Sequence, residues 1–231
     1  MPETPLSAAP HPVSALPAAA DAALDTLLSR RSCWPLVEPG PDDAALRTIF
    51  DAALRAPDNG RLRPWRFILV RGAAREALGE IMVDIAHQRA PGTTRESHRH
   101  RAQRATVAPV MIALGASVDD TSGIPEVEQL LSVGAATMNM LNAIHALGLG
   151  GFWVTGPDSY DPALRRALGF EAQERVLGFL FVGTPRNALR TASRPARADH
   201  VREWFGPQRS AEAFGDEAVP ALAGQAARRS A

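Results

Sequence analysis

The sequence predicts a layered domain of the α+β or α/β class. Segments rich in β-branched and aromatic residues alternate along the chain with segments whose apolar residues recur every three or four positions. At least four strand candidates are interleaved in this way with about as many helices. The chain has 231 residues, of which 45% are hydrophobic and 22% are charged, so it can bury a core of this kind.

The elements are assigned in order from apolar spacing, capping residues and Pro or Gly breaks. Asp42 is placed to cap the second helix, and Pro57 lies just beyond its end. The polar stretch SHRH at 97–100 is interpreted as a solvated turn. In chain order we predict a helix over 21–31, a helix from Asp42 to about Leu54, a strand at 65–70, a helix over 73–88, a strand at 108–117, a helix over 126–148, a strand at 151–156, a helix over 162–168 and a strand at 175–183.

The helix over 126–148 is the longest and is apolar on most sides. A membrane span is the competing interpretation, but polar residues such as Asn139, Asn142 and His145 interrupt the run too often for that. One small domain offers limited cover for such a helix. We therefore expect it to lie in the middle of the fold and to pack against a second copy of the chain.

The composition suggests a soluble protein of a reducing compartment. Cys33 is the only cysteine, and the N-terminus lacks the pattern of a secretory signal, so we expect a cytoplasmic location. A formal net charge of zero argues against a general nucleic-acid or membrane binder. The Pro- and Ala-rich ends predict a disordered arm over 1–20 and a flexible tail over 207–231, around one domain over 21–206.

Arginine supplies every basic residue, because the chain contains no lysine. The first candidate cluster is Arg30, Arg31 and Ser32, at the predicted end of the first helix. Two guanidinium forks and a hydroxyl match the oxygens of a phosphate. Arginine near a helix C-terminus is also common as a cap for the last carbonyls, and on the residues alone that interpretation is favoured.

Two further clusters have a structural interpretation beside a functional one. Arg55 and Asn59 flank a Pro-Asp turn, and the amide of Asn59 could donate to and accept from a heteroaromatic ring. On the residues alone, the favoured interpretation of that loop is a plain connector between a helix and a strand. The third cluster is the glycine-rich run 148–156, GLGGFWVTG, whose backbone could approach a flat ligand closely. It could equally be a glycine helix cap followed by a strand.

Other sites are poorly supported. His87, His98, His100 and His145 do not lie at the spacing of zinc ligands, and we expect no metal. The chain has neither the glycine pattern of a Rossmann dinucleotide site nor a P-loop. No serine has the sequence context of a nucleophile elbow, so acyl chemistry is unsupported as well.

Five landmarks in one register resemble the nitroreductase family of flavoproteins, in particular its small bacterial NAD(P)H nitroreductases. They are LLSRRS, EPGP, RAPDNGRLRPWRF, the long helix running into GLGGFW, and GFLFVGTP, and together they cover residues 20 to 186. The resemblance implies an α+β fold with a mostly antiparallel central sheet flanked by helices. It also implies an obligatory homodimer with the long helix at its core and FMN bound at the subunit interface.

The same resemblance assigns site residues by position. Arg30, Arg31 and Ser32 would hold the FMN phosphate and ribityl chain, and Arg55 and Asn59 would face the flavin. Trp153, Val154 and Thr155 would come from the glycine-rich segment, expected from the other subunit. NAD(P)H would reduce FMN, and a small electron-poor acceptor such as a nitroaromatic or quinone would be reduced next in a ping-pong cycle. No side chain is expected to act as a nucleophile or as a general acid or base.

Four positions depart from this family branch. Asn59 replaces a histidine, Gly60 a lysine, Val154 an arginine, and Pro35 a basic residue. Each change removes possible positive charge near the ring, although Arg61 and Arg63 could restore some of it. An alternative function therefore stays open, in which the protein binds or sequesters flavin with little reductase turnover. A third possibility, a helical interaction module without flavin, requires all three clusters to be only caps and turns.

Overall fold

The computed structural model describes residues 18–187, 193–207 and 212–213. It divides the chain into two compact units: Thr26–Leu189 forms the larger, and the two ends of the chain, Met1–Asp25 and Arg190–Ala231, form the other. All three clusters singled out in the sequence lie in the larger unit. The predicted arm over 1–20 and the tail over 207–231 lie almost entirely outside the described residues.

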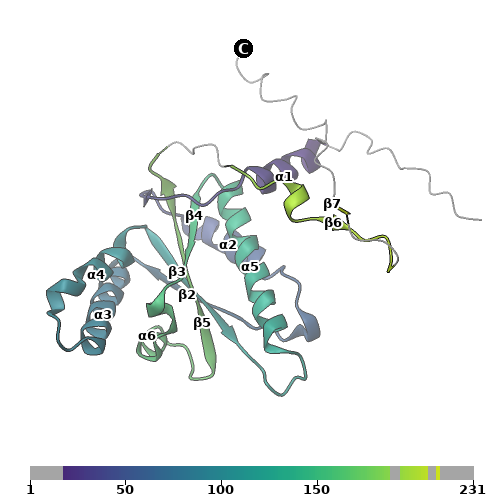
Figure 1. The fold of residues 1–231 in the computed structure, drawn as a ribbon. Coiled ribbons are helices and arrows are strands. Elements are labelled where there is room, and N and C mark those ends of the chain that lie inside the picture. Colours follow the sequence, from purple (N-terminus) through teal and green to yellow (C-terminus); the bar gives the residue numbers. More distant parts are fainter. Residues whose placement is uncertain (1–17, 188–192, 208–211, 214–231) are drawn as a thin grey trace, which may run out of the picture. The chain divides into compact units, whose positions relative to one another are not determined.

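A five-stranded antiparallel sheet forms the centre of the larger unit (Figure 1). Its longest strand, β5, pairs with β3 along eight residues and with the edge strand β4, and every strand pair is antiparallel. The strands are β1 (Leu36–Val37), β2 (Trp65–Arg71), β3 (Val110–Ser117), β4 (Gly150–Val154) and β5 (Glu174–Pro185). This confirms the α+β class and the antiparallel sheet implied by the family resemblance.

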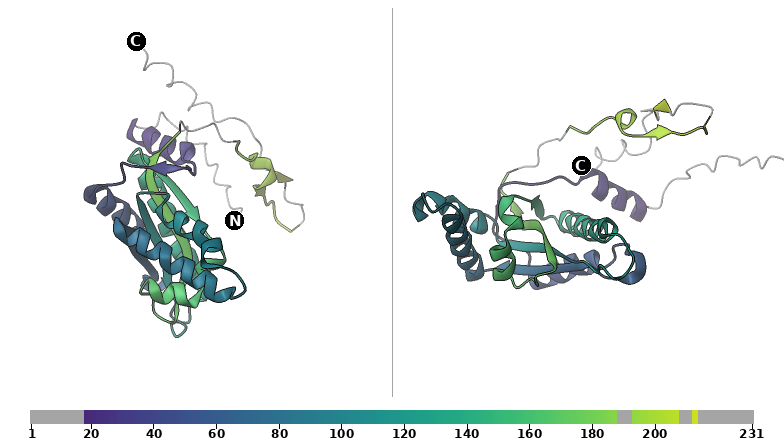
Figure 2. Two further views of the ribbon diagram at one scale, coloured as in Figure 1. Left: turned by 90° about the vertical axis from the view of Figure 1, so that its left-hand side faces the viewer. Right: turned by 60° about the horizontal axis from the view of Figure 1, so that its bottom comes forward.

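Helices cover both faces of the sheet (Figures 1 and 2). On one face Ile112 and Leu180 pack under α2 (Asp43–Ala53) and α5 (Glu126–Ala146). On the other face Met111 and Phe181 pack with residues of α3 (Ala73–Arg89), α4 (Arg99–Thr106) and α6 (Pro162–Ala167). Neighbouring residues of one strand point to opposite faces, so this arrangement explains why β3 and β5 are apolar at nearly every position.

Most of the predicted helices are confirmed with bounds shifted by a few residues. Asp42 caps α2 as predicted, because its carboxylate accepts the backbone N–H of Ala45 at 2.8 Å. Helix α1 spans Ala18–Ser29 and so ends before Arg30 and Arg31, which the sequence had placed in its last turn. The backbone N–H of Arg30 still donates to the Thr26 carbonyl at 3.2 Å, so Arg30 directly follows the last helical residue, where a side chain can reach the last carbonyls of the helix.

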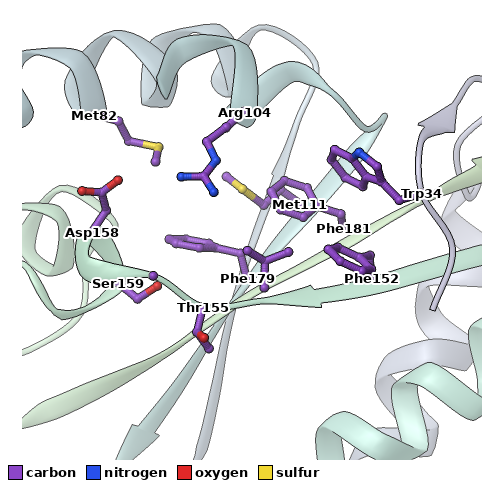
Figure 3. Close-up of a pocket in the computed structure, with 12 residues that line it drawn as sticks. Trp34, Met82, Arg104, Met111, Phe152, Thr155, Asp158, Ser159, Phe179 and Phe181 are labelled. Carbon is purple, nitrogen blue, oxygen red and sulfur yellow. The ribbon is translucent and has the colours of Figure 1, made fainter. Parts of the chain in front are cut away.

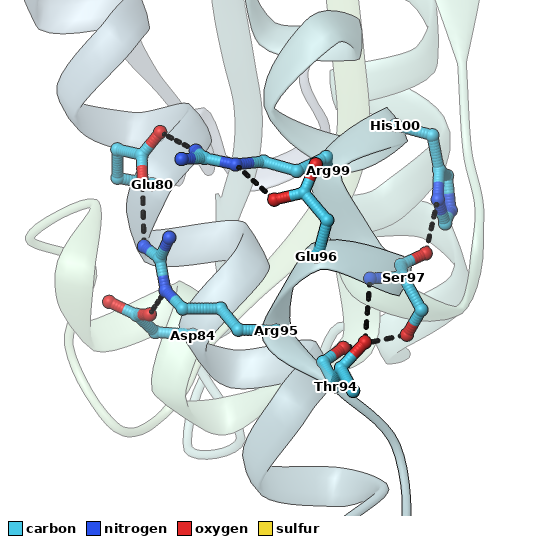
Figure 4. A network of polar contacts seen from close by, with 8 residues as sticks. All are labelled: Glu80, Asp84, Thr94, Arg95, Glu96, Ser97, Arg99 and His100. Atoms are coloured by element: carbon cyan, nitrogen blue, oxygen red, sulfur yellow. Dashed lines mark hydrogen bonds and ion pairs between the residues drawn. The ribbon is translucent and has the colours of Figure 1, made fainter.

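Residues 95–106 form helices, so the interpretation of SHRH as a solvated turn is wrong. A short 3-10 helix, η2 (Arg95–His98), leads directly into α4. Arg95 donates to Glu80 and Asp84 of α3, and Arg99 donates to the other oxygen of Glu80 (Figure 4). These ion pairs hold residues 95–106 against α3. The pattern of residues 95–106 alone does not indicate partners on another helix.

The unit formed by the chain ends contains one small strand pair. Strand β6 (Arg202–Glu203) runs antiparallel to β7 (Glu212–Ala213), after a 3-10 turn, η4 (Arg197–Asp199). The predicted flexible tail thus includes two residues that pair as a strand. Within the described part of the chain, no helix is long and apolar enough to cross a membrane.

Candidate functional site

The Arg30–Ser32 segment lies beside the start of the glycine-rich strand. The backbone N–H of Cys33 donates to the carbonyl of Gly151 at 3.1 Å. This close approach requires a glycine, because a Cβ on Gly150 would lie 2.5 Å from Leu36 Cδ2 and 3.1 Å from Cys33 Cβ. Two of the three clusters found in the sequence are therefore neighbours within one chain.

We call Arg30, Arg31 and Ser32, together with the adjacent start of β4, the Arg30–Ser32 corner. The end of α5 lies against this corner. The Nε2 atom of His145 lies 2.8 Å from Ser29 Oγ, and the two atoms share a hydrogen bond. Burial lowers the pKa of His145, and the positive charges of Arg30 and Arg31 lower it further, so both guanidinium groups act on the imidazole. Burial raises the pKa of the Cys33 thiol, so this cysteine is a small buried apolar group here.

A cavity of about 390 Å³ opens between β4, β5 and the α3–α4 pair (Figure 3). Its wall is largely aromatic, and Trp34 packs on Phe152 with ring centroids 5.4 Å apart. Val154 and Thr155 line it from β4 and the residue after it, while Trp34 follows Ser32 by two positions. The remaining apolar lining residues are Met82, Met111, Phe179 and Phe181. A largely apolar hollow with few polar groups is typical of sites for flat organic cofactors.

Arg104 supplies a positive charge to this cavity. It projects from α4, and Figure 3 shows its guanidinium between Met82 and Met111, directed into the hollow. Its neighbours on the same segment, Arg95, Arg99 and Arg101, all pair with carboxylates. The side chain of Arg104 makes no hydrogen bond or ion pair with any residue that the structure describes. A guanidinium beside aromatic walls without a carboxylate suits an anionic or electron-rich edge of a ligand.

An ion-pair cluster fixes the far end of the cavity. Asp158, in the 3-10 turn η3 (Pro157–Tyr160), is buried and pairs with Arg101 of α4. Its second oxygen lies 3.6 Å from the guanidinium of Arg89, at the end of α3. Because η3 follows directly after β4, these contacts fasten both helices to the glycine-rich strand and keep the cavity wall in place.

The outer edge of β4 carries backbone groups that a ligand could reach. Among the strands that the structure describes, only β5 pairs with β4. The Gly151 carbonyl points away from β5, because it accepts from the N–H of Cys33. Backbone groups of an antiparallel strand alternate in direction, so the N–H and C=O of Trp153 point to that same outer side. The indole of Trp153 is anchored separately by its donation to the Leu177 carbonyl at 3.2 Å.

The second cluster lies elsewhere in the chain. The amide of Asn59 donates to Glu128 at 2.8 Å, in the first turn of α5, whereas His145 is in the last turn. At a rise of roughly 1.5 Å per residue, those two positions are about 25 Å apart along the helix. Arg55 is exposed in the same loop. One chain therefore does not bring Arg55 and Asn59 to the Arg30–Ser32 corner.

The backbone of this loop explains one departure from the family pattern. Gly60 has φ +72°, and a Cβ at this position would lie 2.3 Å from Ile124 Cδ1. Arg61 and Arg63 also have positive φ values, of 56° and 50°. A lysine at position 60 would be strained in this conformation, so the glycine belongs to the way this loop is built.

Trp34, Arg104 and Asp158 are cavity residues that sequence reasoning missed. Arg104 is far from residues 34 and 154 in the sequence, and no spacing rule links it to them. The described residues also contain no group of three or more His, Cys, Asp or Glu side chains arranged to hold a metal ion.

Comparisons with known proteins agree on one family. The family model with the description "Nitroreductase family" matches residues 27–184. "Putative NAD(P)H nitroreductase YdjA" of Escherichia coli K12 is 34% identical over 164 residues, 71% of this chain and 88% of that protein. A "Putative NAD(P)H nitroreductase" of Haemophilus influenzae is 31% identical over 189 residues, 79% of this chain and 97% of that protein.

Solved structures show the same fold. A nitroreductase-like protein from Bacillus cereus superimposes with a TM-score of 0.68 at 21% identity, over 80% of this chain and 96% of that one. The crystal structure of a "putative nitroreductase in complex with fmn" from Desulfovibrio desulfuricans has a TM-score of 0.60 at 28% identity, over 80% and 98% of the two chains.

Proposed function

The chain belongs to the nitroreductase family, and on that basis we propose that it is an FMN-dependent oxidoreductase that takes its electrons from NAD(P)H. One observation carries the proposal. A single cavity is lined both by Trp34, which follows the Arg30–Ser32 corner, and by Val154 and Thr155 of the glycine-rich segment. A ligand with a flat ring and a phosphate tail would engage both clusters at once.

The residues present fit FMN. The aromatic and methionine side chains of the cavity suit the ring, and the outward N–H and C=O of Trp153 suit its polar edge. Arg30, Arg31 and Ser32 would hold the phosphate and ribityl chain. The arginines would bind the phosphate here, as lysine does in many other proteins. Arg104 would place a positive charge beside the ring, and this offsets the charge lost at Asn59, Gly60, Val154 and Pro35.

A homodimer would complete this site. Val127 and Leu131 of α5 are 61% and 65% exposed, and the half-exposed Trp153 lies next to them around a shallow apolar hollow. Packing of a second copy of the chain on this surface would remove its apolar side chains from water. Arg55 and Asn59 are remote from the corner within one chain, so in the dimer they would reach the flavin from the partner.

This proposal differs from the family resemblance in which subunit supplies which site residues. The resemblance had suggested that Trp153, Val154 and Thr155 come from the other subunit. The hydrogen bond between Cys33 and Gly151 instead supports Arg30–Ser32 and the glycine-rich segment acting together from one chain. In our proposal the loop with Arg55 and Asn59 is the partner's contribution.

Bound FMN would supply hydride chemistry, and the protein would supply binding, orientation and charge. The cavity walls would exclude water from one side of the ring, and the edge of β4 would orient its polar side. Arg104 would stabilise the reduced, more negatively charged ring. The proposed acceptors are small electron-poor compounds, such as nitroaromatics or quinones, reduced in alternation with NAD(P)H oxidation. The alternative, flavin binding with little turnover, is favoured by Asn59, whose amide is already engaged by Glu128.

The test is an absorbance spectrum of purified protein before and after reductant. We expect a yellow protein, or one that becomes yellow with one equivalent of FMN per chain, and bleaching when NADH or NADPH is added without oxygen. A yellow protein that neither nicotinamide reduces would favour the flavin-binding alternative. A colourless protein that ignores added FMN would contradict both.

A further inference from the structure

His145 occupies a junction that the proposed cofactor chemistry leaves unexplained. It is the penultimate residue of α5, and its Nε2 atom shares a 2.8 Å hydrogen bond with Ser29, the last residue of α1. Arg30 and Arg31 follow Ser29 directly. The imidazole is partly buried and contacts the residue that precedes the segment assigned to the phosphate.

Burial and two positive charges oppose the protonation of His145. Burial has the larger effect on its pKa, and Arg30 and Arg31, on the segment after α1, lower the pKa further. Ser29 is neutral, and the buried thiol of Cys33, near the same two arginines, is protonated at neutral pH. No carboxylate among the described residues forms an ion pair with this histidine. The partial negative charge at the C-terminus of α5 acts in the opposite direction, because it favours the protonated imidazole.

We propose that His145 is a proton-coupled member of the phosphate site, neutral in the empty corner and protonated when a phosphate dianion binds beside Arg30 and Arg31. This inference rests on the proposed function. A dianion would cancel the field of the two arginines and add an attraction of its own. Binding of FMN would then take up a proton, which riboflavin, without the phosphate, would not induce.

Uptake of a proton on binding makes the affinity for FMN depend on pH. The second ionisation of a phosphate monoester lies near pH 6, so between pH 6.5 and 8.0 the ligand is mostly the dianion. Within that window, a protein that gains a proton on binding holds FMN less tightly as the pH rises. A single coupled proton limits the change to about tenfold per pH unit.

The experiment measures FMN and riboflavin dissociation constants at several pH values from 6.5 to 8.0, by quenching of flavin fluorescence. Wild-type protein should lose affinity for FMN several-fold across the range, and riboflavin affinity should stay flat. H145Q should bind FMN with no such slope. H100Q is the matched control, because His100 is exposed on α4 and shares a hydrogen bond with the Ser97 carbonyl, away from the arginines. It should keep the wild-type slope.

A second measurement needs no variant. Calorimetric titration of wild-type protein with FMN, in two buffers of different ionisation enthalpy, gives the protons taken up per bound ligand. We expect a fraction of a proton at pH 7 for FMN and none for riboflavin. Equal values for the two ligands, or an unchanged slope in H145Q, would overturn the inference while leaving FMN binding intact. Failure of wild-type protein to bind FMN at any pH would overturn the proposed function, and this inference with it.

Discussion

The backbone N–H of Cys33 and the carbonyl of Gly151 are joined by a 3.1 Å hydrogen bond across 118 positions of sequence. This bond sets the Arg30–Ser32 corner against the start of β4, and Phe152 and Val154 of the same strand line the aromatic cavity. The two halves of the proposed FMN site are thereby held in fixed relation within one chain.

Substitution of Gly150 by alanine should weaken FMN binding by tenfold or more. The new Cβ would lie 2.5 Å from Leu36 and 3.1 Å from Cys33, so the segment that carries the arginines would have to move. Flavin fluorescence quenching measures the effect. Gly92→Ala is the control, because nothing lies within 4 Å of its added methyl group, and it should bind FMN as the wild type does. Equal affinities in the two variants would contradict the proposed role of the contact.

Replacement of Arg104 by glutamine should lower the reduction potential of bound FMN, because a positive charge beside the ring favours its reduced, more negative form. The measurement is a spectroelectrochemical titration against a reference dye. Arg99→Gln is the matched control on the same helix. Its side chain binds Glu80 at the protein surface, so the potential should not change. A potential that is the same in Arg104→Gln and wild type would place the ring outside this cavity.

Glu80→Gln should destabilise the protein in a pH-dependent way. Hydrogen bonds from Arg95 and Arg99 lower the pKa of Glu80, so its ion pairs form fully above the pKa of the unfolded chain, roughly 4.3. This contribution disappears as the pH falls through the lower, folded-state pKa. Melting temperatures of wild type and variant should therefore differ near pH 7 and converge as the pH falls below about 4. A difference that stays constant with pH would show that Glu80 acts through packing.

Leu131→Glu should prevent dimer formation and weaken FMN binding together. The side chain is 65% exposed on α5, beside Val127 and Trp153, and a carboxylate there would be buried by a second copy at a high cost. Light scattering and FMN titration measure the two effects. Ile81→Glu, on α3 across the sheet, should leave a dimer that still binds FMN. A wild-type monomer that retains flavin would contradict this account of the interface.

Local sequence patterns were sufficient for the elements that surround the site. The Asp42 cap, the apolar runs of β3 and β5 and the spacing within α5 depend on neighbours close in sequence. Helices η2 and α4 were missed because their ion-pair partners, Glu80 and Asp84, lie on another helix. The cavity was missed for the same reason, since Trp34, Arg104 and Val154 meet only when the sheet and helices are assembled.

The candidate residues divide in a similar way. Resemblance to a family identified Arg30, Arg31 and Ser32 together with the glycine-rich segment, and the structure places these two groups side by side. The same pattern could not reveal that Asn59 lies at the opposite end of α5, bound to Glu128. Sequence order alone carries no information about which groups meet within one chain and which meet across two.

Discrimination between FMN and riboflavin tests the central claim most directly. The two ligands share the ring, so a difference in their affinities reports the phosphate alone. We expect wild-type protein to prefer FMN by at least about tenfold, since one charge-assisted contact contributes roughly 1.5–3 kcal/mol. Arg31→Gln should lose most of that preference while still binding riboflavin. Equal affinity of the wild type for both flavins would contradict a phosphate site at Arg30, Arg31 and Ser32.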